Sequence, residues 1–492
     1  MNLLFLLAVP VLTALAVLIA GSKQQVRWVA LAGSAIQLVL AFLLFFAFRA
    51  ERAGNNTSQM LFDQTYPLIE ELNIHFLIGV DGISVSMILL TAFVVIAGVL
   101  VSWNIEKMTK EFYFLLILLA LGAYGFFISL NLFVLFFFLE ISVIPKYLLI
   151  GIWGSGKKVY SANKLVLMLM MGSGLILVGL LGLYYIGGKD FDLVHLAATK
   201  IAPSMQHLIF PLLFLGFGVF TALFPLHTWV PDGHSSAPTA GSMFLAGISM
   251  KLGGYGCLRV AVYLLPEGAK EYANMIIILS SIAILYGAFV TMMQKDLKYI
   301  NAYSSVSHVG FSLLAIGMLT QTAISGALLQ MISHGLMTAL FFAVIGMIYD
   351  RTHTRLVDEL GGLMKMMPFI TTVLFLVGLC SLGLPGLSGF VAEMTVFVGS
   401  WQNPDMFHRI ATIAAAMSIV VTAVYILRAV GKTAMGPVNN SAYVELKDAG
   451  WNEKLAAIIL LVGIISIGIA PGWLNDLLTP GAEIIANRFA GK

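Results

Sequence analysis

Three ionisable residues stand inside long apolar stretches of the chain. Glu140 ends the run LFVLFFFLE, Lys251 directly follows MFLAGISM, and Glu393 lies in GLSGFVAEMTVF. An ionisable group in the hydrocarbon layer of a membrane costs roughly 3 kcal/mol on insertion scales, so it is rare unless it has a function. Burial disfavours the charged form, whereas a neighbouring opposite charge favours it. Groups balanced in this way can take up and release protons near neutral pH, although a structural ion pair between helices would leave the same pattern.

Two histidines extend this set. His308 lies in SSVSHVGFSLL and His334 in LLQMISHGLMTALFF, and both segments also carry serines. An imidazole accepts a hydrogen bond on one nitrogen and donates from the other, so it can relay protons. A lone histidine on an apolar face is more often a hydrogen-bonded packing residue, but two on neighbouring segments favour a relay. His227 and His234, nearer a polar loop, are equally compatible with proton uptake and with helix capping.

Two further lysines are weaker candidates for the same chemistry. Lys146 follows Pro145 inside an apolar run, where its long side chain could also extend to a membrane surface. Lys164 stands at the start of the next run, where an interfacial anchor is an equally good interpretation.

The composition shows what kind of protein positions these groups. The chain has 492 residues, of which 60% are hydrophobic and 10% charged. Soluble proteins carry about 25% charged residues, so this is an integral membrane protein. The net charge of +3 and the absence of basic runs argue against a nucleic-acid partner. Two cysteines, Cys257 and Cys380, are too few for an iron–sulfur or structural zinc site.

Apolar runs of roughly 20 residues are long enough to cross a bilayer as helices. The sequence predicts an all-α integral membrane protein with about fourteen such helices. Breaks are expected near Pro225 in the seventh run and at Leu384-Pro385-Gly386 in the twelfth, and broken helices at matching places in two halves often mark a transport site. The runs lie near 2–20, 28–48, 82–102, 112–130, 132–152, 163–186, 208–226, 239–264, 274–293, 300–320, 323–348, 367–399, 409–428 and 455–476.

The distribution of lysine and arginine predicts the orientation. The loops after odd-numbered runs hold sixteen of these residues and the loops after even-numbered runs hold six. The positive-inside rule therefore places the odd loops in the cytoplasm and both termini outside. The first run has no basic residue before it and Lys23 after it, which is the reverse of a signal peptide, so a retained first helix is expected. No polar stretch is long enough to fold alone, which favours one polytopic domain over residues 1–492.

Four motifs stand out in the chain: FPLHTWVPDGHSSAPTAGSMFLAGISMKLGGYGCLR (224–259), QKDLKYINAYSSVSHVG (294–310), QMISHGLMTALFF (330–342) and LPGLSGFVAE (384–393). Together they resemble a known family, the antiporter-like subunits of proton-pumping NADH:quinone oxidoreductase (respiratory complex I). The resemblance covers roughly residues 80–437. YLLIGIWG (147–154) and YDRTHTR (349–355) are most similar to chain M, also called chain 4, and the chain ends too soon after its fourteenth helix for the long lateral helix of chain L.

The resemblance implies fourteen helices with two inverted five-helix repeats, helices 4–8 (about 112–264) and 9–13 (about 274–428). It implies a proton path through Glu140, Lys251, His308, His334 and Glu393. It also implies that no redox cofactor binds this chain, that its partners are other membrane subunits including neighbouring antiporter-like chains, and that it resides in a bacterial inner membrane.

The sequence departs from the family at one important position. The family usually has a lysine on the seventh helix, and the matching position here is Phe220. Leu139 replaces a usual tryptophan, and Lys146 replaces an apolar residue. We hypothesise that Lys146 or Lys164 supplies the missing charge next to Glu140.

Two other functions remain open from the sequence. One is a D-type subunit of a multisubunit sodium/proton antiporter, which shares these motifs; copurifying iron–sulfur and flavin subunits, or small antiporter chains, would discriminate. The other is a structural spacer that does not conduct, which Phe220 favours. The retained Glu140, Lys251 and Glu393 argue against a spacer, because it would gain stability by losing intramembrane charges.

Overall fold

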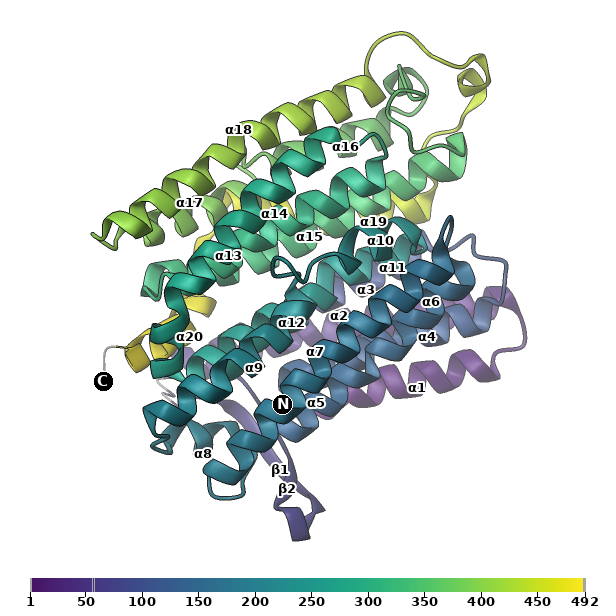
Figure 1. Cartoon of the computed structure of the whole chain (residues 1–492). Helices are drawn as coiled ribbons and strands as arrows, with labels where there is room; N and C mark the ends of the chain where they lie inside the picture. The colour runs from purple at the N-terminus through teal and green to yellow at the C-terminus, as the bar shows by residue number, and fades with distance from the viewer. Residues whose placement is uncertain (1, 55, 57, 490–492) are drawn as a thin grey trace.

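The computed structural model describes residues 2–54, 56 and 58–489. Most of these residues lie in long helices that run side by side in one bundle (Figure 1). Ten helices in the described ranges are long and apolar enough to cross a membrane. The helices are α1 (Phe5–Ile19), α2 (Lys23–Ala53), α3 (Gly82–Val101), α4 (Thr109–Ile128), α5 (Leu132–Ile141), α6 (Val143–Trp153), α7 (Lys158–Ile186), α8 (Leu193–Ala198), α9 (Pro203–Thr221), α10 (Trp229–Ser236), α11 (Thr239–Phe244), α12 (Met250–Gly256), α13 (Pro266–Met293), α14 (Leu297–Gly317), α15 (Gln321–Thr352), α16 (Pro368–Ser381), α17 (Ser388–Trp401), α18 (Met406–Ala434), α19 (Trp451–Ile469) and α20 (Gly472–Phe489).

Polar side chains set where several of these helices begin. Ser22 accepts a hydrogen bond from the Gln25 amide at the start of α2, and Asp81 does the same for Ser84 at the start of α3. Asn131 and Asp296 cap α5 and α14. Each cap satisfies backbone amides that have no partner inside the helix, so the transition from loop to helix is fixed at these residues.

The two breaks predicted from the prolines are present. α9 ends at Thr221 and α10 begins only at Trp229, so the seventh apolar run turns around Pro225. α16 ends at Ser381 and α17 begins at Ser388, with the Leu384-Pro385-Gly386 segment between them. The fifth run is also interrupted, because α5 ends and α6 begins on either side of Ser142. Freed backbone groups at membrane depth are tolerated only where protein or water satisfies them, so these breaks mark the interior.

The helix that contains Lys251 is irregular in a different way. Two π-helical segments, η2 (Leu245–Ser249) and η3 (Cys257–Val262), enclose α12. Isolated π-helical turns inside α-helices occur frequently at functional sites. The lysine therefore lies in a short regular segment between two locally widened ones.

Two elements near the ends of the bundle were not predicted. Between the second and third predicted runs, in a polar stretch for which the sequence predicts no regular structure, strands β1 (Leu61–Ile69) and β2 (Ile74–Val80) form an antiparallel hairpin, with Tyr66 opposite Phe76. The fold is thus mostly helical but not wholly α. Beyond the fourteenth run, α20 packs on α3 and α15 through an apolar face that includes Leu474 and Leu478. Its other face is polar, so its hydropathy is too low to be recognised as a membrane span.

The centre of the bundle is α15, the green helix at the middle of Figure 1. Its most apolar stretch is completely buried, and it packs against α3, α14, α17 and α19. A helix that is surrounded by other helices can hold polar side chains away from lipid. α15 carries His334 near its midpoint, and the candidate site is built around it.

Candidate functional site

Lys251 and His334 are in direct contact. The Lys251 ammonium nitrogen Nζ lies 2.7 Å from His334 Nδ1, and it also donates a hydrogen bond to the backbone carbonyl of Ala246 in the π-helical segment η2. Both side chains are buried. The two residues come from adjacent elements, α12 and α15, and form one ionisable pair.

Two glycines allow these elements to approach. A Cβ atom added to Gly335 would lie 2.9 Å from the carbonyl oxygen of Gly247, and one added to Gly247 would lie 3.3 Å from the carbonyl oxygen of Gly335. Because both distances are shorter than ordinary contacts, larger residues would push η2 and α15 apart. Gly335 directly follows His334, so this backbone contact positions the imidazole beside Lys251.

The line of ionisable groups continues from His334 to Glu393. The ring centroids of His334 and His308 are 5.7 Å apart. His308 Nδ1 lies 3.3 Å from Glu393 Oε1, and its Nε2 lies 3.0 Å from the hydroxyl of Ser381. The contact with Glu393 is a close approach without hydrogen-bond geometry. α14 supplies His308 and α17 supplies Glu393, while Ser381 is the last residue of α16.

Glu140 and Lys146 form a second group in the first half of the chain. The Ser173 hydroxyl of α7 donates a hydrogen bond to Glu140 Oε1. Lys146 Nζ donates to the Ser142 hydroxyl at 3.0 Å and lies 5.9 Å from the centroid of the Phe220 ring. Glu140 is partly exposed, whereas Lys146 is buried.

The structure places Lys164 and the loop histidines elsewhere. Lys164 Nζ is 2.7 Å from Asp232 Oδ2, and about a quarter of each side chain is exposed, so Lys164 is engaged at the end of the bundle. His227 is buried and stacks on Phe224. His234 stacks on Phe342, and within residues 2–54, 56 and 58–489 neither of its ring nitrogens has a hydrogen-bond partner.

Several buried charged residues were not singled out from the sequence. Asp81 and Arg259 form an ion pair in which both side chains are nearly inaccessible. Arg259 lies inside the apolar run 239–264, so the rarity of intramembrane charges could have singled it out. Lys298 lies between the predicted runs 274–293 and 300–320, yet it is buried and donates to the Ala237 carbonyl at 2.7 Å.

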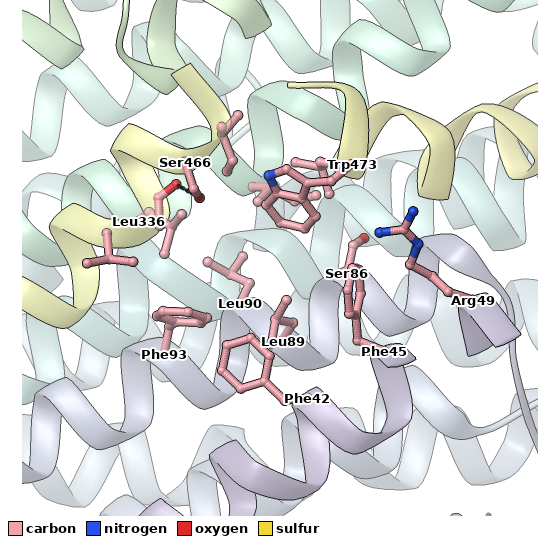
Figure 2. Close-up of a pocket in the computed structure, with 15 residues that line it drawn as sticks. Phe42, Phe45, Arg49, Ser86, Leu89, Leu90, Phe93, Leu336, Ser466 and Trp473 are labelled. Carbon is pink, nitrogen blue, oxygen red and sulfur yellow. Dashed lines mark hydrogen bonds between the residues drawn. The ribbon is translucent and has the colours of Figure 1, made fainter. Parts of the chain in front are cut away.

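An apolar pocket opens at a separate place (Figure 2), between α2, α3, α15, α19 and α20, with a volume of about 280 Å³. Phe42, Leu90, Phe93 and Trp473 are among its lining residues, and Arg49 lies at one end. It has no ionisable lining residue other than Arg49, so it is not part of the line described above.

A bundle of membrane-spanning helices with internal breaks and a buried series of ionisable groups defines a polytopic membrane protein. Comparison with known proteins identifies the family. The family described as "NADH:quinone oxidoreductase/Mrp antiporter, TM" matches residues 129–422. This chain is 36% identical over 484 residues to NAD(P)H-quinone oxidoreductase chain 4 of Gloeobacter violaceus, covering 97% of this chain and 91% of that one. It is also 36% identical over 474 residues to the chloroplastic NAD(P)H-quinone oxidoreductase chain 4 of Angiopteris evecta, covering 95% of this chain and 94% of that one.

Solved structures show the same fold. A chain of respiratory complex I from Thermus thermophilus with bound NADH matches with a TM-score of 0.90 and 27% identity, covering 99% of this chain and 100% of that one. A chain of the Mrp complex from Dietzia sp. matches with a TM-score of 0.85 and 18% identity, covering 100% of this chain and 97% of that one. This match shows a similar fold alone. The protein belongs to the NADH:quinone oxidoreductase/Mrp antiporter membrane-subunit family.

Proposed function

We propose that this chain is a proton-translocating membrane subunit of an NADH:quinone oxidoreductase, similar to chain 4. The single observation that carries the proposal is the contact series from Lys251 through His334 and His308 to Glu393. Four ionisable side chains from four elements of the bundle would not be brought together in its interior without a function, because each is costly to bury. The identity of 36% to the chain 4 relatives over nearly the whole chain supports the same function.

The geometry supports a stepwise transfer. A proton passes directly between Lys251 Nζ and His334 Nδ1, since their separation is that of a hydrogen bond. The imidazoles of His334 and His308 are too far apart for a direct hydrogen bond, so transfer between them needs a mediating group such as water. His308 and Glu393 lie close together without a hydrogen bond, so the last transfer needs a reorientation of the imidazole or the carboxyl group. In the first half of the chain, Glu140 with its Ser173 partner takes up or releases a proton.

The remaining parts of the proposal concern topology and partners. Counting α5 with α6, α9 with α10, α11 with the segments to η3, and α16 with α17, and leaving out α8 and α20, gives fourteen spans. We place spans 4–8 and 9–13 in two inverted five-helix repeats over about 112–264 and 274–428. Both termini face the outside of a bacterial inner membrane. Redox groups reside in other subunits, this chain binds none, and quinone reduction is coupled to proton transfer through contacts with those subunits.

The antiporter alternative has weaker support, because the Mrp structure resembles this chain in fold alone. The spacer alternative is disfavoured by the retained buried groups. Only Glu140 of the proposed path lies partly exposed, and Lys251, His308, His334 and Glu393 are all buried.

The test is proton pumping in membrane vesicles that contain the whole complex, with NADH-to-quinone electron transfer assayed in parallel. Glu140→Gln and Lys251→Met each remove one titratable group. In each variant, proton pumping and electron transfer should both fall while the complex still assembles. Glu111→Gln, which alters an exposed glutamate at the start of α4, is the matched control and should pump normally. Normal pumping in both test variants would show that the chain is a spacer.

A further inference from the structure

The apolar pocket of Figure 2 lies apart from the line of ionisable groups and opens at the surface of the bundle. Its outer margins are Phe42 on α2, which is 37% exposed, and Val462 on α19, which is 56% exposed. Leu89 and Leu90 of α3 also line it and are buried. The pocket is therefore a gap between α2 and α19 that leaves part of α3 uncovered.

The polar atoms of the lining are already bonded within their own helices. The Ser86 hydroxyl donates to the Ile83 carbonyl at 2.7 Å, and the Ser466 hydroxyl donates at 2.9 Å to the carbonyl of Gly463. Apolar cavities stay dry, so water does not fill a pocket of about 280 Å³ with this lining. The part of any occupant that enters the pocket must be apolar.

The pocket lies at one end of the membrane-spanning part of α2. Trp28, near the start of α2, packs with Trp103 and Trp451 at centroid distances of 5.2 and 6.3 Å, and tryptophans are enriched at membrane surfaces. Arg49 lies about 32 Å farther along α2 at 1.5 Å per residue, close to the thickness of the hydrocarbon core. On the same scale Phe42 and Arg49 are about 10 Å apart. The pocket therefore lies within one leaflet, next to the surface at which Arg49 stands.

The two helices that border the pocket meet at its far end. Trp28 of α2 and Trp451 of α19 stack on each other, whereas Phe42 and Val462 of the same two helices line the gap. A helix of a neighbouring subunit would have to cross the whole hydrocarbon core, about 30 Å. Because the stacked tryptophans close the gap at one surface, it is too short for such a helix and matches an acyl chain, which extends through one leaflet.

Arg49 supplies a positive charge at one end of the pocket. Its guanidinium carbon lies 5.7 Å from the centroid of the Phe45 ring, and it pairs with no carboxylate in the part of the chain that the structure describes. The spacing of Phe42, Phe45 and Arg49 puts all three on one face of α2. The loops on this side of the membrane hold six lysines and arginines against sixteen on the other, so Arg49 is not among the charges that set the orientation. An anionic group from outside the chain would compensate its charge.

The geometry points to an anionic phospholipid as the occupant of this pocket, a binding site that does not depend on the proposed proton path. Its acyl chain lies against Phe42 and Leu90, and its phosphate pairs with the Arg49 guanidinium, whose planar donors match a phosphate. Trp473 contacts Phe45 edge-to-face at 5.7 Å, one turn from Arg49, where an indole suits the headgroup region. A zwitterionic lipid would bring its own ammonium to the guanidinium, so a lipid with a net negative charge is preferred.

Photolabelling of the intact, purified assembly that contains this chain tests the site. Phosphatidylglycerol with a photoreactive diazirine in its acyl chain should label the α2 and α19 peptides that contain Phe42 and Val462. Arg49→Gln should lower this labelling by about tenfold, the effect of losing one charge-assisted hydrogen bond. Ser466→Trp should remove most of it by filling the pocket. A phosphatidylcholine with the same acyl chain should label the unaltered assembly severalfold less.

Two matched variants serve as controls. Ser466→Ala removes the same hydroxyl as Ser466→Trp but leaves the pocket open. Arg52→Gln removes a positive charge at the same membrane surface, from an arginine that already donates to the carbonyls of Asn56 and Gln59 at 2.9 and 3.3 Å. Both controls should be labelled to the same extent as the unaltered assembly.

Three results would overturn the proposal. They are unchanged labelling in either Arg49→Gln or Ser466→Trp, equal labelling by the two lipids, and a disulfide crosslink from Val462→Cys to a helix of a neighbouring subunit. If Ser466→Trp does not assemble, Arg49→Gln and the comparison of the two lipids decide. Because lipid labelling is measured rather than pumping, the outcome is separate from that of the proposed function.

Discussion

At the scale of single residues, the central feature is that the ionisable partner of His334 is a lysine. A buried lysine can lose its proton, whereas the arginine guanidinium stays protonated in proteins. The Lys251 ammonium also has a backbone acceptor, Ala246, that does not titrate and holds it in place. The pair is thus positioned by the fold, and its protonation remains free to change.

Lys251→Arg should therefore abolish pumping although it preserves the charge. The guanidinium cannot deliver a proton to His334, so we expect a loss similar to that of Lys251→Met. Proton pumping driven by NADH in membrane vesicles measures this loss. Lys164→Arg, which keeps the surface pair with Asp232, should pump normally, and wild-type pumping by Lys251→Arg would show that Lys251 acts only as a fixed charge.

At the scale of elements, the break between α16 and α17 positions Glu393. Gly383 has a φ of +73°, and a Cβ added to it would lie 2.6 Å from Glu393 Oε2. Gly386 in the same break has a φ of +92° but no atom within 4 Å of an added Cβ. The two glycines thus share a left-handed backbone, and only one of them makes room for the carboxylate.

This difference gives a matched pair of variants. Gly383→Ala and Gly386→Ala should both lose about 1–2 kcal/mol of stability from the left-handed backbone. Only Gly383→Ala should also displace the Glu393 side chain from His308 and lower proton pumping. Thermal unfolding in detergent and vesicle pumping measure the two effects, and equal pumping by the two variants would contradict this account.

A surface cluster joins the start of α2 to the α3–α4 loop. Glu106 lies 2.6 Å from Lys23 and 2.5 Å from Arg27, and these hydrogen bonds hold the pKa of its carboxyl below the ordinary value. A lowered pKa in the folded state means that the stabilisation is present above the unfolded carboxyl pKa and is lost as the pH falls through the folded pKa.

Glu106→Gln should consequently lower the melting temperature slightly at neutral pH and low salt. The difference from the unaltered protein should shrink in acid and at high ionic strength, because exposed charges are screened. Melting curves in detergent across pH and salt measure it. A difference that persists unchanged in acid would show that the ion pairs do not contribute.

At the scale of the whole molecule, α15 joins the parts of the bundle. It contacts α14 and α17, which carry His308 and Glu393, and also η2, next to Lys251. Because its most apolar stretch is fully buried, it holds His334 away from lipid. One central helix therefore positions four ionisable groups that are far apart in the sequence.

The proposed partners can be tested on the intact assembly. A tagged form of this chain, purified in mild detergent, should copurify with flavin and iron–sulfur subunits and with NADH-to-quinone activity. Absorbance spectra and mass spectrometry of the purified sample measure this. Small antiporter chains without flavin would instead indicate the antiporter alternative.

The membrane helices, two of their breaks and most of the candidate ionisable residues can be predicted from the sequence. The apolar runs require membrane helices, because hydrocarbon leaves the backbone no other partners, and Pro225 and Pro385 place two of the breaks. The rarity of intramembrane charges singles out Glu140, Lys251, His308, His334 and Glu393. The same rule also applies to Arg259, although the sequence prediction did not include it. These signals are local, since each depends on a residue and its immediate neighbours along the chain.

Only the tertiary structure shows how these residues are paired. Lys251 and His334 meet because Gly247 and Gly335 let two distant segments touch, and no local pattern encodes that contact. The sequence left Lys146 and Lys164 as equal candidates, whereas packing places the first against Phe220 and the second with Asp232. The hairpin of β1 and β2 forms through pairing between two strands, and α20 is stabilised by packing on α3 and α15. Neither element is predicted from its local sequence. Hydropathy determines which segments enter the membrane, but side-chain packing between them determines which groups can exchange a proton.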